Sequence, residues 1–229
     1  MKAAPVALAI LMTMVGAPRA MAQLSAVEHQ IVQAVDRQFE GGMQFLERVV
    51  NINSGTGNHE GVRRVGRLFA GELESLGFDT WWVDMPDSVH SAGHLFAERR
   101  GSSGRRLLLI GHLDTVFEED SPFQTFVRGD SIARGPGVSD MKGGDVAILQ
   151  ALRALDSVGA LDDTQIVVAL MGDEEESGKP TSVSRAALVE AAQRSDAALA
   201  FEGGPVGLGS VSVARRGISR PFFRSPYHQ

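Results

Sequence analysis

Apolar residues recur at helical spacing in two long segments near the start of the chain. The first segment covers residues 27–50, where Gly41 and Gly42 are candidates to break the helix. The second covers residues 62–76 and is followed by Gly77, at the position where glycine commonly ends a helix. Further helices are expected over residues 143–158 and 182–193.

Between these helices lie short runs rich in β-branched, aromatic and other apolar residues, which predict strands. They cover residues 80–84, 94–98, 107–110, 166–171 and 197–201. A further run, residues 126–133, has Gly129-Asp130 at its centre and predicts an exposed hairpin. Alternation of strands and helices is typical of an α/β fold. We expect a three-layer domain with a mixed, mostly parallel central sheet and helices on both faces.

The composition narrows the function classes. The chain has 229 residues, of which 43% are hydrophobic, and a formal net charge of −6. This length and hydrophobic content are enough for one substantial core, and the acidic balance gives no basic surface for nucleic acid or an anionic membrane. Because the chain contains no cysteine, any metal must be held by His, Asp and Glu side chains.

The first 22 residues resemble an export signal. Lys2 precedes an apolar run from Val6 to Val15, and the small residues Ala20 and Ala22 stand before Gln23. The run is shorter than the roughly 20 apolar residues that span a bilayer. We therefore expect a cleaved leader, a secreted or periplasmic protein and no membrane association after cleavage.

Polar residues gather where predicted strands end, the usual place for ligand sites in α/β folds. The segment 107–114 ends a strand with His112 and places Asp114 two residues later. A histidine that binds metal usually gives its other ring nitrogen to a carboxylate or carbonyl, a part that Asp114 can fill. The alternative is a strand-end histidine beside a capping aspartate.

A glycine-rich bend, residues 135–144, places Asp140 just before a predicted helix. Asp140 alone is equally compatible with a helix N-cap. The glycines suggest a phosphate loop, but the segment lacks both the G-x-G-x-x-G pattern and the G-K-[ST] ending.

Two further strand ends carry acids. Asp173, Glu174, Glu175 and Glu176 follow the run 166–171, and Glu202 follows the run 197–201. Adjacent carboxylates repel one another, so such a run needs either solvent or a cation. A solvated acidic turn is the alternative to a metal site.

In order and spacing, these segments resemble the zinc exopeptidases and deacylases that include glutamate carboxypeptidase, aminoacylase and succinyl-diaminopimelate desuccinylase. The resemblance covers roughly residues 35–217 and is strongest to the glutamate carboxypeptidase branch in residues 49–58. It implies two zinc ions, amide hydrolysis by a metal-activated water, and a small-molecule or peptide substrate with a free carboxylate. It also implies the residue roles: His112 and Glu202 as zinc ligands, Asp140 as the bridging ligand, Glu175 as a ligand and Glu174 as the general base.

The chain departs from the family pattern after Gly217. Family members continue into a smaller α+β dimerisation domain and return with a second zinc-ligating histidine, whereas residues 218–229 contain Pro221 and Pro226 and match neither. His228 lies in no motif. We therefore expect three segments: a leader (1–22), the N-terminal part of a catalytic domain (23–217) and a divergent or truncated tail (218–229).

Two consequences follow from that division. Because the second zinc-ligating histidine is missing, we expect one or no tightly bound zinc and little activity, and the dimerisation region is expected to be missing as well. A non-catalytic secreted domain that binds metal or another ligand is the alternative function.

Overall fold

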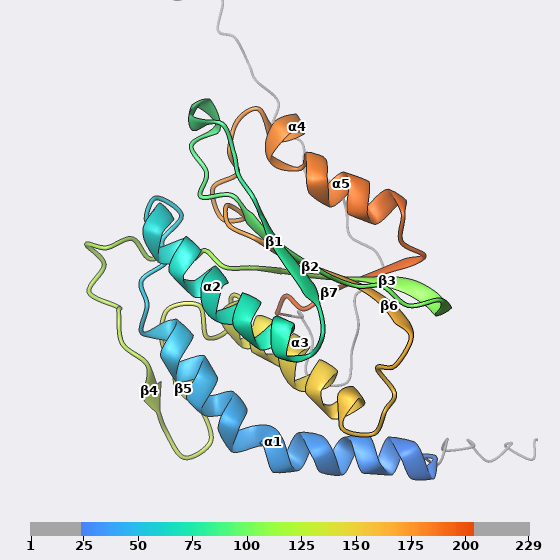
Figure 1. Cartoon of the computed structure of the whole chain (residues 1–229). Helices are drawn as coiled ribbons and strands as arrows, with labels where there is room; N and C mark the ends of the chain where they lie inside the picture. The colour runs from blue at the N-terminus through green and yellow to red at the C-terminus, as the bar shows by residue number, and fades with distance from the viewer. Residues whose placement is uncertain (1–23, 204–229) are drawn as a thin grey trace, which may run out of the picture.

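The computed structural model describes residues 24–203, which form three layers. A five-stranded sheet lies between α1, α2 and α3 on one face and α4 and α5 on the other (Figure 1). The predicted leader (1–22) and tail (218–229) lie outside the described residues and stay predictions. No helix among residues 24–203 is long and apolar enough to cross a membrane.

Helix α1 (Ala26–Val50) is continuous through both glycines. It begins with a capping box, in which Ser25 and Glu28 exchange side-chain and backbone hydrogen bonds. A Cβ on Gly42 would come within 2.8 Å of Gln150 Nε2, on α3 (Lys142–Asp156). Gly42 therefore permits close packing of the two helices and does not break α1.

Helix α2 (His59–Ser75) begins at Asn58, whose side chain accepts a hydrogen bond of 2.9 Å from the Gly61 N–H. Gly77 follows the helix with φ of +76°, which confirms its predicted place at the helix end. Together α1, α2 and α3 pack against the sheet through one large apolar cluster.

The sheet has the order β1-β2-β6-β3-β7. These strands are β1 (Asp79–Val83), β2 (His94–Arg99), β3 (Ser103–His112), β6 (Thr164–Met171) and β7 (Ala197–Ala200). β3 pairs in parallel with β6 and β7, whereas β2 is antiparallel to both β1 and β6. Only β2 therefore runs against the other four strands, so this sheet is mixed and mostly parallel, as predicted. A short 3₁₀ helix, Asp87–Val89, connects β1 to β2.

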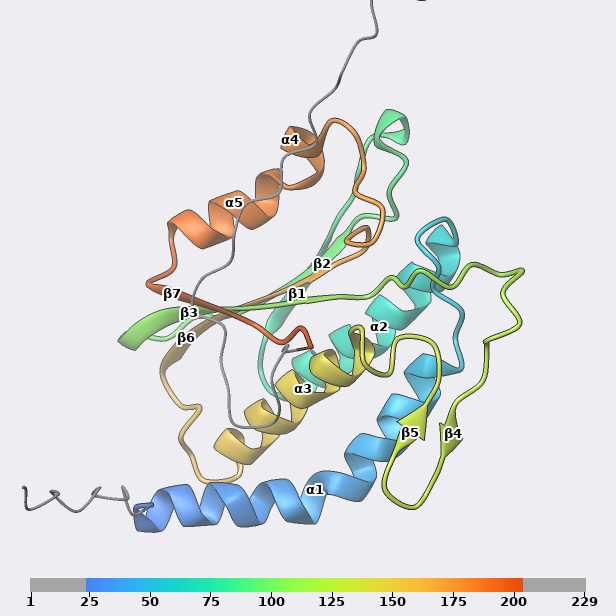
Figure 2. The same ribbon diagram turned by 180° about the vertical axis from the view of Figure 1, so that it is seen from behind.

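The predicted hairpin is present as β4 (Val127–Arg128) and β5 (Ala133–Arg134). The Gly129 N–H donates to the Ile132 carbonyl at 2.8 Å and closes the turn. Arg128 makes two hydrogen bonds to the Glu40 carboxylate, at 2.7 and 2.9 Å. The hairpin thus lies along the C-terminal half of α1 (Figure 2).

The single helix predicted over residues 182–193 is wrong, because the chain forms α4 (Thr181–Ser184) and α5 (Ala186–Gln193). The break falls at Arg185 (φ −96°, ψ 2°). Both Ser184 and Arg185 bind the buried Asp173 carboxylate. Those bonds, which the apolar pattern does not reveal, coincide with the turn between the two helices.

Candidate metal centre

His112 is the last residue of β3 and is 1% exposed. Its Nε2 atom lies 2.9 Å from Asp140 Oδ1 and 3.5 Å from Glu202 Oε2. Asp140 belongs to the loop before α3, and Glu202 follows β7. One ligand atom from each of the three side chains lies within 4.8 Å of the others. The parallel strands β3 and β7 and the loop before α3 therefore bring three predicted ligands together from distant parts of the sequence.

Asp114 supports this cluster in two ways. Its backbone carbonyl lies 3.0 Å from His112 Nδ1, and its carboxylate lies 3.4 Å from the same atom. The carboxylate also accepts hydrogen bonds from Thr56 Oγ1 at 2.7 Å and from the N–H groups of Glu174 and Glu175 at 3.0 and 3.1 Å. Asp114 thus connects the His112 turn to the loop after β6 and to Thr56, a residue that the sequence analysis missed.

The acidic run after β6 divides into separate environments. Asp173 is fully buried and accepts hydrogen bonds from Ser184 Oγ at 2.7 Å and the Gly178 N–H at 3.1 Å, besides its ion pair with Arg185. Glu174 and Glu176 are exposed, and Glu175 is half-buried. Asp173 therefore anchors α4, while the other three acids lie nearer to solvent.

The charge around His112 favours a cation. Burial opposes a charge on His112, but the Asp114 hydrogen bond and the charges of Asp114, Asp145 and Glu202 outweigh it and raise its pKa to about 10. Burial and the charge of Asp140 raise the pKa of Glu175 to about 7. Such pKa shifts are typical of carboxylates gathered in one place.

Lys142 links the metal cluster to the N-terminal helix. Its ammonium group is buried and donates to the Val49 carbonyl at 2.9 Å and to the Ile52 carbonyl at 3.0 Å. Burial lowers its pKa to about 7, against the opposing charge of Asp145. Lys142 therefore holds the end of α1 against the segment that carries Asp140, a role that the Met-Lys-Gly-Gly sequence alone did not indicate.

His94 has a structural role. It is fully buried at the start of β2, where Nδ1 accepts from the Gly172 N–H at 3.1 Å and Nε2 donates to the Ser184 carbonyl at 2.8 Å. Burial lowers its pKa. A neutral imidazole meets both hydrogen bonds, and neither ring nitrogen remains for a metal.

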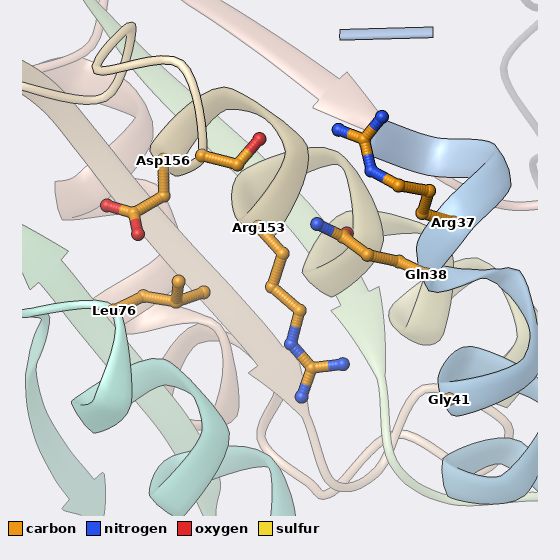
Figure 3. Close-up of a pocket in the computed structure, with 7 residues that line it drawn as sticks. Arg37, Gln38, Gly41, Leu76, Arg153 and Asp156 are labelled. Atoms are coloured by element: carbon orange, nitrogen blue, oxygen red, sulfur yellow. The ribbon is translucent and has the colours of Figure 1, made fainter. Parts of the chain in front are cut away.

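A separate hollow of about 450 Å³ lies between α1 and α3. Figure 3 shows Arg37 and Gln38 from α1 on one side of it and Arg153 and Asp156 from α3 on the other. None of the six predicted site residues lines it. The predicted site residues therefore lie away from this hollow.

Comparisons with known proteins show which family part of this chain resembles. Residues 108–216 match the family model described as peptidase family M20/M25/M40. The matched segment contains all six predicted site residues.

Curated relatives point to the same family. Carboxypeptidase G2 of Pseudomonas sp. (strain RS-16) is 34% identical over 215 residues, which are 92% of this chain and 50% of the relative. An acetylornithine deacetylase of Klebsiella pneumoniae (strain 342) is 39% identical over 94 residues, or 39% of this chain and 24% of the relative. The chain thus spans about half the length of the carboxypeptidase relative.

Solved structures show the same fold. Human carnosine dipeptidase 1 superimposes with a TM-score of 0.64 at 22% identity, covering 75% of this chain and 40% of that protein. The M20 family metallo-carboxypeptidase Sso-CP2 from Sulfolobus solfataricus gives a TM-score of 0.58 at 19% identity, covering 71% of this chain and 37% of that protein. The sheet and its flanking helices are therefore those of this peptidase fold.

Proposed function

We propose that this chain forms the metal-binding part of a hydrolase that cleaves amide bonds. The observation that carries the proposal is the cluster of His112, Asp140 and Glu202, with ligand atoms within 4.8 Å of one another. Its parts come from the ends of β3 and β7 and from the loop before α3, all within the segment that matches the peptidase family.

The donor set fits zinc. One imidazole nitrogen and two carboxylates are the hard or borderline ligands that catalytic zinc accepts while keeping a position open for water. The Asp114 carbonyl, 3.0 Å from His112 Nδ1, leaves Nε2 facing the two carboxylates. When bound, zinc would lower the pKa of a water and polarise a substrate carbonyl.

The loop after β6 supplies the two remaining roles. We assign Glu174 as the general base, because it is exposed and its backbone is fixed by the Asp114 carboxylate. A positioned carboxylate can take a proton from water and return it to the leaving amine. We assign Glu175 as a ligand of a second metal position, which Asp140 would bridge to the first. Since that position has only two ligands among the described residues, we expect one tightly bound zinc per chain.

The proposed substrates are amides that carry a free carboxylate, such as N-acyl amino acids or peptides with a C-terminal glutamate. Support comes from the relatives, which are a carboxypeptidase, acetylornithine deacetylases and succinyl-diaminopimelate desuccinylases. Each of these names describes cleavage of an amide or peptide bond next to an amino acid.

Zinc binding by the purified chain tests the metal proposal directly. Calorimetric titration should give one tight site that is lost in His112→Ala and kept in His59→Ala, an exposed histidine at the start of α2. Equal zinc affinity of both variants would contradict the assignment.

Hydrolysis of N-acyl amino acids and glutamyl amides tests the catalytic roles. In a version of the protein with both metal positions complete, Glu174→Gln should keep zinc and lower kcat by about 10²–10⁴-fold, the usual contribution of a general base. Glu176→Gln, the exposed control in the same loop, should leave kcat unchanged. A kcat of Glu174→Gln equal to that of the wild type would contradict the assignment of Glu174 as general base.

A further inference from the structure

Asp145 is a buried carboxylate without a visible partner. It lies in the first turn of α3 and is 1% exposed. Both of its carboxylate oxygens are buried and lack a hydrogen-bond partner among residues 24–203. Burying an unpaired carboxylate is costly, so such a residue needs a physical reason.

The carboxylate lies directly beneath the end of β3. A Cβ on Gly111 would come within 1.9 Å of Asp145 Oδ1, so the carboxylate occupies the space that a side chain at position 111 would fill. The next residue along the strand is His112. Lys142, one turn away on α3, directs its ammonium group to the Val49 and Ile52 carbonyls instead.

The surrounding charges connect Asp145 to the metal cluster. Burial raises its pKa well above the ordinary value, the positive charges of His112 and Lys142 lower it, and the negative charges of Glu202 and Asp114 raise it further. Each of these groups except Lys142 belongs to the cluster or supports it. Added positive charge at the cluster would therefore stabilise the Asp145 carboxylate.

We propose that Asp145 is a positioning residue of the metal centre, whose buried carboxylate behind Gly111 strengthens cation binding and destabilises the cation-free protein. This inference rests on the proposed function of the His112 cluster. It explains why an unpaired carboxylate is kept beneath β3: the group that compensates it is the bound cation. A residue with a purely structural role would instead stabilise the protein in the absence of metal.

Asp145→Asn, which keeps the shape and removes the charge, tests the inference in the full chain. We expect its zinc affinity to fall by about 10–100-fold, as for other groups that support metal ligands. We expect the Tm of the metal-free variant to rise by about 2–4 °C, the shift that a small stabilisation gives in a domain of this size. Asp156→Asn, an exposed acid on the same helix, should change neither quantity.

The outcomes separate the inference from the proposed function. Zinc affinity of Asp145→Asn equal to that of the wild type, or a lowered Tm without metal, would overturn the inference and leave the proposed function intact. No zinc binding by the wild type would overturn the proposed function and the inference with it. Asp145→Ala, measured in parallel, provides the same two readouts if the asparagine variant does not fold. Failure of both to fold would show that the carboxylate is needed for the fold and would overturn the inference.

Discussion

The two faces of the sheet are covered in different ways. On one face, α1, α2 and α3 bury a large apolar cluster that includes Phe69, Leu152 and Leu170. On the other face, the buried cluster formed by residues 24–203 is smaller and consists of Phe96, Leu108, Val167, Ala169 and Ala191. Alternating residues of one strand serve the two sides, as a strand requires: in β6, Val168 faces the large cluster and Val167 the small one.

Besides this small apolar cluster, polar contacts hold the two ends of the segment formed by α4 and α5. At one end, Arg185 and Ser184 bind Asp173. At the other end, Arg194 donates to the buried Glu98 carboxylate at 2.6 Å. Apolar packing therefore dominates on the α1–α3 face, whereas hydrogen bonds and ion pairs hold α4 and α5 in position.

The largest effect is expected from Phe69→Ala. Phe69 is fully buried in the large cluster and makes an edge-on contact with Phe45, with ring centroids 5.2 Å apart. Truncation should lower the free energy of unfolding by about 3–5 kcal/mol. Urea denaturation measures it, with Phe39→Ala as the exposed control on α1. An equal loss of unfolding free energy in both variants would contradict the conclusion that apolar packing dominates on this face.

Arg185→Ala should cost less, about 2–3 kcal/mol, because it removes a charged hydrogen bond to buried Asp173 while Ser184 and Gly178 still donate to that carboxylate. The same denaturation experiment measures this cost. Arg67→Ala, which breaks an ion pair with the exposed Glu60, is the control and should have little effect. A negligible cost for Arg185→Ala would mean that polar bonds do not hold α4.

A smaller, pH-dependent effect is expected at His94. Burial lowers its pKa from 6.5 in the folded protein, so the unfolded chain binds the proton more readily. His94 therefore adds stability above pH 6.5, which is lost as the pH falls below that value. Chemical denaturation between pH 7 and pH 5 should show the loss. His94→Gln should flatten this part of the profile, whereas a flattened profile in the exposed variant His90→Gln would contradict the assignment.

The smallest effect is expected from Leu199→Ala on β7. Leu199 is 46% exposed, so its truncation should change the free energy of unfolding by at most about 0.5 kcal/mol. The same holds for Val189→Ala on α5, where Val189 is 50% exposed. A loss of 2 kcal/mol or more would show that another part of the protein covers this face in solution.

Much of the fold follows from the apolar pattern alone. Strands β2, β3 and β6 contain the runs 94–98, 107–110 and 166–171 that predict them, and the hairpin around Gly129 is also found where it is predicted. The pattern fails at Arg185, because helical periodicity carries no information about a distant buried acid that binds Ser184 and Arg185.

The candidate site shows the same limit. Strand ends predicted that His112 and Glu202 would lie at one edge of the sheet, since parallel strands place their carboxyl ends together. Asp140, in a bend before a helix, was expected beside them only because of the family resemblance. The supporting contacts could not be predicted in this way. Thr56 and Lys142 act through bonds to groups 58 and 93 residues away in sequence, and only the tertiary structure defines such pairs.

Lys142 also couples the end of α1 to the segment that carries Asp140. Its ammonium group contacts Val49 in the last turn of α1 and Ile52 just after the helix, so moving this segment away from the one that carries Asp140 requires breaking both contacts. We expect that turn and the segment that carries Asp140 to unfold locally as one unit. We therefore expect amide hydrogens near Val49 to exchange with solvent more slowly when the metal centre is occupied, because Lys142, 93 residues further along the chain, joins Val49 to the segment that carries Asp140.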